Sequence, residues 1–350
     1  MGLYGVDIKG LIESVQRNCD ISDARHAGDY TLCIYLLKMR EFYRWQAGLD
    51  WQESPEQGAV MEWVTARESV WAELENADYQ QLSLSDALID PFDEEAVNDE
   101  LNPLGYLYTA GYGRFGKPVF LLARLEEQEQ TPGYRLRIAG EELARELAAP
   151  PAMARKGSIV VRNASLQRLL WELVEEWRWK RPRNAMSRVV DYYGFDRDPG
   201  QALEQASRDQ QETLILHEIG EITAGEVLGA GWNRMLTAML CTGAELGARA
   251  VRDHLADCLI LLPALLQDKF EPSLHFYFAN LTPLRKDLFP ALVTAYDDWV
   301  AGGDLGGITR AVRHGQRHWS ECGREMLALH QRQGVEACAG IEQLVGKSAL

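Results

Sequence analysis

Three ionisable side chains, His217, Glu218 and Glu221, lie within one strongly apolar stretch, residues 212–229. An α-helix advances about 100° per residue, so His217 and Glu221 are expected on one face, one turn apart, with Glu218 beside them. Most other residues of the stretch are apolar or small, and such a helix is usually buried. A buried carboxylate must be paired, protonated or bound to a metal, because an isolated buried charge is very costly. The stretch therefore predicts a polar site inside a helical core.

A second predicted helix, residues 244–266, adds His254 and Asp257 one turn apart. His254 shares a face with small and apolar residues, so its imidazole is expected to point into apolar packing. Glu41 lies in an apolar stripe of a third predicted helix, residues 24–47. Two imidazoles and four carboxylates on apolar faces suit a dinuclear iron or manganese site inside a helical bundle. The predicted ligands are Glu41, His217, Glu218, Glu221, His254 and Asp257.

This set of side chains resembles the ligands of the ferritin-like carboxylate proteins, and the resemblance implies an oxidoreductase. Those proteins carry Glu-x-x-His, whereas the order here is His-x-x-x-Glu and His-x-x-Asp. The stretch also resembles the zinc-hydrolase motif His-Glu-x-x-His with its second histidine replaced. That resemblance implies a mononuclear zinc site at His217, Glu221 and His254, with Glu218 as the catalytic general base.

The alternative to a metal site is a buried network in which arginines neutralise the carboxylates. Arginines close to these acids in the predicted helices are Arg40, Arg44, Arg249 and Arg252. For Glu41, an ion pair with Arg40 or Arg44 is the simpler interpretation. A network of this kind only specifies packing, so the protein would then be a non-enzymatic scaffold or interaction protein.

Two other stretches carry weaker signals of ligand binding. The loop at residues 111–118 contains three glycines and Lys117, but it lacks the spacing and the Lys-Ser/Thr ending of a phosphate-binding loop. It is predicted to be a hairpin connection, and no nucleotide cofactor is predicted. Trp177 and Trp179 alternate with basic residues, a pattern that can bind nucleic acid. Cations before Pro182 also suit a helix C-terminus, and the acidic charge of the chain favours this interpretation.

The chain has 350 residues, 46% of them hydrophobic, and a formal net charge of −16 at pH 7. These values are ordinary for a soluble globular protein, and the charge argues against binding to nucleic acid or to an anionic membrane. Residues 68–112 hold eleven acidic residues and no Lys or Arg, so this segment is predicted to be a solvated surface or a long loop. No membrane span and no signal peptide are predicted.

The six cysteines lie far apart and form no Cys-x-x-Cys pair. This spacing favours a reduced, cytoplasmic protein over a disulfide scaffold. Cys33, Cys241 and Cys258 fall in apolar helical surroundings, where free thiols are expected to pack as small hydrophobic groups.

The hydrophobic periodicity predicts a mainly α fold, in which a helical bundle domain follows an α+β region with a small antiparallel sheet. Residues 1–150 form the α+β region, with helices at 8–17, 24–47, 57–75 and 141–148 and strands at 105–112, 118–126 and 134–138. Residues 149–157 are the predicted linker, and a strand is predicted at 158–162. Residues 157–350 otherwise form an all-helical domain, with helices at 165–180, 184–193, 200–229, 232–241, 244–266, 284–300, 307–331 and 335–345.

Two runs of the sequence, DYTLCIYLLKMREFYRW at 29–45 and GYGRFGKPVFLLARLE at 111–126, resemble an uncharacterised bacterial protein family. The resemblance covers most of the chain and implies no activity. No substrate, protein partner or oligomeric state follows from the sequence.

Overall fold

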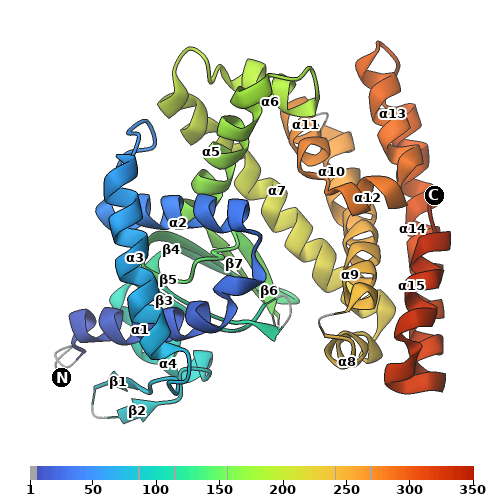
Figure 1. The fold of residues 1–350 in the computed structure, drawn as a ribbon. Coiled ribbons are helices and arrows are strands. Elements are labelled where there is room, and N and C mark those ends of the chain that lie inside the picture. The colour runs from blue at the N-terminus through green and yellow to red at the C-terminus, as the bar shows by residue number, and fades with distance from the viewer. Residues whose placement is uncertain (1–5, 86, 114–115, 156, 241, 269) are drawn as a thin grey trace. The chain divides into compact units, whose positions relative to one another are not determined.

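The chain folds into two compact units. The N-terminal unit consists of Met1–Pro151 and Val160–Trp171, and the C-terminal unit consists of Ala152–Ile159 and Glu172–Leu350. Figure 1 shows that helices and strands mix in the first unit, whereas helices dominate the second. The computed structural model describes residues 6–85, 87–113, 116–155, 157–240, 242–268 and 270–350.

The N-terminal unit packs helices against an antiparallel sheet (Figure 1). Its helices are α1 (Ile8–His26), α2 (Leu32–Ala47), α3 (Gln57–Leu74) and α4 (Glu94–Leu101). The main sheet has the strand order β3-β4-β5-β7-β6. Its strands are β3 (Tyr106–Tyr112), β4 (Pro118–Thr131), β5 (Tyr134–Arg145), β6 (Ala152–Arg155) and β7 (Ser158–Arg162). Of these, β6 and the first two residues of β7 are assigned to the C-terminal unit. Helix α1 packs across β4 and β5, and Val15, Phe120 and Leu122 belong to the core between them.

The predicted fold class is confirmed: the protein is mainly α, with an antiparallel sheet in its N-terminal half. The predicted hairpin is also confirmed, because β3 and β4 pair antiparallel with Tyr112 opposite Pro118. Arg114 and Phe115 of its connection lie outside the described residues. No helix in the described part of the chain combines the length and the apolar character needed to cross a membrane.

The first predicted helix was too short, because α1 continues from Ile8 to His26. Asp20, Ser22 and Asp23 are residue types that often cap helices, but here they are buried inside α1. Each has a partner there: Asp20 pairs with Arg67, the Ser22 hydroxyl donates to a β4 carbonyl, and Asp23 pairs with Lys117. Tertiary contacts therefore keep these polar residues helical, where local hydrogen bonding alone would favour a helix end.

The helix predicted at 141–148 is wrong, because β5 extends to Arg145. Pairing with β4 places Glu142 opposite Ala123 and Arg145 opposite Leu121. The sequence of this segment favours a helix, but the hydrogen bonds of the neighbouring strand outweigh that local preference.

The acidic segment, residues 68–112, is more regular than predicted. It contains the end of α3, the two-stranded sheet of β1 (Leu82–Leu84) and β2 (Ala87–Ile89), helix α4 and strand β3. Most of its acidic side chains are exposed or half-buried, so the solvated surface is confirmed and the long loop is not.

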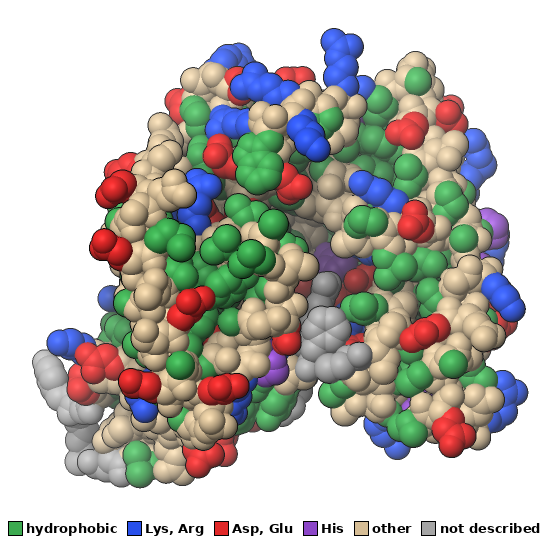
Figure 2. Space-filling model, viewed as in Figure 1, with side chains coloured by type: hydrophobic (Ala, Val, Ile, Leu, Met, Phe, Trp, Pro, Cys, Tyr) green, Lys and Arg blue, Asp and Glu red, His purple; other side chains and the backbone are tan. Residues whose placement is uncertain are grey.

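Helix α2 exposes several large hydrophobic side chains in its first turns. They are Leu32, Ile34, Leu36 and Leu37, and the space-filling view shows hydrophobic side chains at the surface of this unit (Figure 2). Cys33 lies among them and is exposed, which contradicts the prediction of a packed thiol. Cys258 is buried as predicted, and Cys241 lies outside the described residues.

The C-terminal unit is an array of helices. Its helices are the second half of α5 (Asn163–Lys180), α6 (Ala185–Tyr193), α7 (Pro199–Leu228), α8 (Gly231–Ala238), α9 (Gly243–Ala256), the π-helical turn Asp257–Leu261, α10 (Leu262–Asp268), α11 (Glu271–Asn280), α12 (Pro283–Leu288), α13 (Pro290–Val300), α14 (Gly306–Gln333) and α15 (Cys338–Lys347). Helix α7 matches the predicted helix at 200–229 closely, but α11 was missed. The predicted helix at 244–266 is interrupted by the π-helical turn.

Candidate functional site

Helices α7 and α9 approach closely at a glycine. A Cβ atom on Gly220 would lie 2.6 Å from the backbone oxygen of Ala256, so any larger residue would push the two helices apart. This close approach brings the polar residues of α7 next to those at the end of α9. Gly220 therefore allows the two helices to pack at this short distance.

His217, Asp257 and Arg285 form a chain of charge-assisted contacts between α7, the π-helical turn and α12. His217 Nδ1 lies 2.7 Å from Asp257 Oδ1, and the guanidinium of Arg285 donates to Asp257 Oδ2. Asp257 starts the π-helical turn, and such turns are frequent at functional sites. The Asp257 side chain is 1% exposed and has a cation on each oxygen.

This ion pairing fixes the charge of the two residues. Burial lowers the pKa of His217, but Asp257 and then Glu221 outweigh burial and raise that pKa to about 10. Burial raises the pKa of Asp257, but Arg285 and His217 hold it well below its usual range. At neutral pH, His217 is therefore an imidazolium and Asp257 a carboxylate. A charged imidazole donates from both nitrogens and cannot accept a metal ion until it loses a proton.

On the other side of His217, Glu221 pairs with a second arginine. Arg252 Nη2 lies 2.5 Å from Glu221 Oε1 and 3.3 Å from Asp253 Oδ1. His217 Nε2 lies 3.7 Å from the same Glu221 oxygen. The predicted neutralisation of a carboxylate by Arg252 is therefore confirmed at Glu221.

Glu218 differs from its neighbours, because it forms no hydrogen bond or ion pair with any residue that the structure describes. It is buried, with 6% of its surface exposed. Burial, and then the charge of Glu221, raise the pKa of Glu218 to about 8. This carboxyl is therefore protonated at neutral pH and can donate or release a proton.

The remaining predicted ligands, His254 and Glu41, have other partners. His254 Nε2 donates to the backbone oxygen of Arg285 at 3.0 Å, and its ring stacks on Trp319 at 5.0 Å. Burial, and then Arg285, lower the pKa of His254 to about 3, so the ring is neutral. Glu41 belongs to the N-terminal unit and pairs with Arg44 at 3.2 Å and with Arg40 at 3.7 Å. The predicted ion pair of Glu41 is thus confirmed.

Within the described residues, no group of three or more His, Cys, Asp and Glu side chains is placed to hold a metal ion. The arginines lie where a cation would compensate the acids: Arg252 at Glu221 and Arg285 at Asp257. The geometry therefore favours the ion network over the metal site.

A pocket of about 510 Å³ adjoins this network within the C-terminal unit. The Glu221–Arg252 ion pair forms part of its wall. The other lining residues come from β6, from the residue before β7, and from α7, α8 and the two residues between these helices: Ala154, Arg155, Gly157, Ile222, Gly225, Glu226, Gly229, Ala230, Trp232 and Asn233. A Cβ on Gly225 would touch nothing within 4 Å, so this glycine leaves the pocket open. This pocket was not predicted from the sequence, because its wall joins residues about seventy positions apart.

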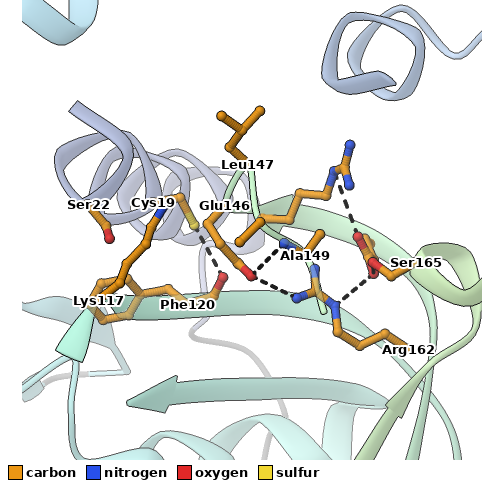
Figure 3. Close-up of polar contacts among 12 residues, drawn as sticks. Cys19, Ser22, Lys117, Phe120, Glu146, Leu147, Ala149, Arg162 and Ser165 are labelled. Carbon is orange, nitrogen blue, oxygen red and sulfur yellow. Dashed lines mark hydrogen bonds and ion pairs between the residues drawn. The ribbon is translucent and has the colours of Figure 1, made fainter. Parts of the chain in front are cut away.

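A second buried network, in the N-terminal unit, was also not predicted (Figure 3). Arg162 donates to Glu142 at 2.9 Å and to Glu146 at 3.0 Å, and the Ser165 hydroxyl donates to Glu142 at 2.6 Å. Burial raises the pKa of Glu142, but Arg162 and then Arg145 outweigh burial and lower that pKa to about 2. Glu142 is thus a fully compensated carboxylate.

The same network reaches α1. Lys117 Nζ donates to Asp23 at 2.7 Å, and Asp23 also accepts the backbone N–H of Leu147 at 2.8 Å. Figure 3 shows the thiol of Cys19 beside the carbonyl of Phe120, to which it donates at 3.4 Å. Burial raises the pKa of this thiol well above its usual range, so it stays protonated and unreactive. These contacts join α1 to the sheet.

One sequence signal could have indicated the N-terminal network. Arg162 ends the otherwise apolar strand Ser158–Arg162, and Asp23 falls in a helix with buried neighbours. A charge in such a position needs a partner of opposite charge. The sequence does not say which of the many acids and bases that partner is.

Comparison with protein families gives two matches that together cover most of the chain. Residues 10–162 match the N-terminal domain of a family of unknown function, DUF6866, and residues 167–348 match its C-terminal domain. No curated protein and no solved structure matched the chain. The predicted resemblance to an uncharacterised family is confirmed, and neither match supports the ferritin-like resemblance.

Proposed function

The chain belongs to this family of unknown function, and we propose that its C-terminal unit binds a small polar molecule beside the charged cluster of α7. The observation that carries the proposal is the pocket of about 510 Å³ whose wall contains the Glu221–Arg252 ion pair. Small-molecule sites are commonly clefts of about 300–1,000 Å³ with a few well-placed polar groups. The pocket has that size and that composition.

The network behind the pocket supports the proposal, because it holds the polar wall in place. Arg252 is oriented by Glu221 and Asp253, and Glu221 is approached by His217, which Asp257 and Arg285 hold in turn. A ligand therefore meets side chains that are already ordered. Binding to a preformed site avoids the entropic cost of ordering long side chains after the ligand arrives.

Glu218 does not line the pocket, but it lies three residues before Glu221 on α7, and burial and the charge of Glu221 raise its pKa. Its raised pKa, to about 8, leaves a carboxyl that can exchange a proton near neutral pH. Perturbed carboxyl groups of this kind cluster at functional sites. We propose Glu218 as the acid–base group if the bound molecule is also a substrate.

A metal ion remains the second candidate function, as iron or manganese at two positions or as zinc at one. It is supported by the raised pKa values of Glu218 and Glu221, which burial chiefly causes and which a bound cation would lower. Deprotonation of His217 would have to accompany such binding. The oxidoreductase and zinc-hydrolase proposals both depend on this step.

The test of ligand binding is a thermal-shift screen of the full chain against polar molecules of four charge classes: zwitterions, anions, cations and neutral polyols. Gly225→Phe fills the pocket from the α7 wall, and Gly225→Ala is the matched control, because a methyl group at this position meets open space. We expect at least one class to raise the melting temperature of the wild type and of Gly225→Ala but not of Gly225→Phe. A screen in which no class shifts the wild type, or in which Gly225→Phe responds equally, contradicts the proposal.

A further inference from the structure

We infer that the ligand of this pocket is a zwitterion of the amino-acid class, with one carboxylate and one ammonium group; this inference rests on the proposed function. The pocket wall contains two carboxyl side chains, Glu221 and Glu226, and two guanidinium side chains, Arg155 and Arg252. A purely anionic ligand would face both acids, and a purely cationic ligand would face both arginines. A ligand with both charges can place each beside its opposite.

The guanidinium of Arg252 in the wall indicates where the carboxylate binds. Arg252 contacts Glu221 and Asp253 through Nη2, and its Nη1 forms no hydrogen bond with a residue that the structure describes. The Arg252 side chain is 17% exposed, and a guanidinium group can only donate. A carboxylate oxygen in the pocket can accept a charge-assisted hydrogen bond from Nη1, which a polyol forms less strongly and an ammonium group cannot form.

The ammonium group is assigned to Glu226. Glu226 is exposed at the pocket, and it forms no hydrogen bond or ion pair with the residues that the structure describes. Glu221 is already paired with Arg252. Glu226 is therefore the carboxylate that can take a new cation without breaking an existing ion pair.

The wall also leaves space for a substituent. Gly225, Gly229, Ala154 and Ala230 line the pocket with hydrogen atoms or methyl groups. A Cβ atom built on Gly225 or Gly229 would have no neighbouring atom within 4 Å among the described residues outside its own helix turn. This room can hold the side chain of a free amino acid.

The experiment titrates the full-length protein with each of the twenty free amino acids by calorimetry and thermal shift. The amino acid that binds best is then compared with its carboxamide, which lacks the carboxylate, and with its N-acetyl derivative, which lacks the ammonium group. We expect each derivative to bind about tenfold more weakly or worse, because each loses one charge-assisted contact.

Glu226→Gln supplies the matched variant. Since Glu226 is exposed, this change is expected to leave the melting temperature of the free protein unchanged. The change should lower the affinity for the free amino acid about tenfold. It should not lower the affinity for the N-acetyl derivative, which has no ammonium group. Equal loss for both compounds would overturn the assignment of the ammonium group.

The outcomes separate the inference from the proposed function. If the protein binds only anions or only polyols, and Gly225→Phe removes that binding, the pocket is a ligand site but its ligand is not a zwitterion. No binding by any class would overturn both. A free amino acid that binds no better than its carboxamide and its N-acetyl derivative would also overturn the inference.

Discussion

The two units each bury a network of carboxylates and cations, but the carboxylates differ in how they are compensated. In the N-terminal unit, Glu142 and Glu146 both pair with Arg162, and Asp23 pairs with Lys117. In the C-terminal unit, Glu218 has no partner among the described residues, while its neighbour Glu221 has Arg252. Burial raises the pKa of both Glu142 and Glu218. At Glu142, Arg162 and Arg145 outweigh burial and lower the pKa to about 2, whereas the pKa of Glu218 is raised to about 8.

The difference indicates two roles for buried charge. A compensated network joins elements of the fold, and each of its carboxylates is paired with a cation. An incompletely compensated carboxyl next to a pocket costs stability and is more typical of a functional site. On this basis we assign the N-terminal network to folding and the C-terminal cluster to binding, and the following predictions test that assignment.

The largest effect is expected from Arg162→Met in the N-terminal unit. The change leaves Glu142 and Glu146 buried without their shared cation, and breaking a buried ion pair from one side costs about 3–5 kcal/mol. Urea unfolding measures the loss, and hydrogen exchange locates it in the N-terminal unit. Arg135→Met removes an exposed arginine from the same sheet and serves as the control. A loss as small as that of the control would contradict the structural role.

Arg285→Met should cost less, about 2–3 kcal/mol, in the C-terminal unit. Asp257 loses one cation but keeps His217 on its other oxygen, so the carboxylate is not fully orphaned. Lys286→Met, the next residue and exposed, is the control for the lost charge. The rate of hydrogen exchange in α9 and α12 should rise in Arg285→Met and not in the control. A loss of unfolding free energy equal to that of Arg162→Met would show that the two networks are equally critical for folding.

The sequence predicted the elements whose patterns are local and missed what depends on distant partners. The extent of α7 and the β3–β4 hairpin follow from periodicity, and the neutralisation of a buried carboxylate by an arginine follows from the cost of a buried charge. That Arg252 pairs with Glu221 is seen only in the structure. The end of β5 does not, because its pairing with β4 overrides a helix-forming sequence. Extended helix α1 is a similar case, since Asp20 and Asp23 find partners in α3 and at the start of β4.

The candidate site was predicted in part for the same reason. Helical spacing places His217, Glu218 and Glu221 together, and that is independent of tertiary structure. The position of Asp257 opposite His217 depends on the close approach at Gly220. Arg285, which compensates Asp257, comes from α12 and has no sequence feature that distinguishes it from other arginines.

A smaller effect, about 2 kcal/mol between pH 5 and pH 7, is expected in the pH dependence of stability. Glu218 has an ordinary pKa of 4.5 and a folded pKa of about 8. Between these values the unfolded chain has released the proton and the folded chain retains it, so the stability of the C-terminal unit falls as pH rises. His217 acts in the same direction between its ordinary value of 6.5 and about 10. One pKa unit corresponds to about 1.4 kcal/mol.

Glu218→Gln should flatten this slope between pH 5 and pH 7, because glutamine does not titrate. The N-terminal unit provides an internal comparison, since Glu142 contributes stability above pH 4.5 that is lost only as pH falls toward about 2. Urea unfolding across pH, with exchange rates read separately for each unit, measures both. A wild-type slope that Glu218→Gln leaves unchanged would show that Glu218 is already ionised, and would remove the contrast between the two networks.

The smallest effect is expected from removal of metal. If Arg252 and Arg285 supply the positive charge of the cluster, the folded protein needs no bound metal for its stability. Exhaustive chelation of the purified protein should then leave its melting temperature unchanged. Metal analysis before chelation is the companion measurement. His217→Ala separates the cases further: in an ion network it destabilises by about 1–3 kcal/mol with or without chelator, since Asp257 loses one partner. If metal is found, and chelation and His217→Ala each remove it with an equal fall in melting temperature, the cluster is a metal site and Glu218 is one of its ligands. The two units would then differ in the cation that compensates their buried carboxylates: an arginine or lysine in the N-terminal unit and a metal ion in the C-terminal unit.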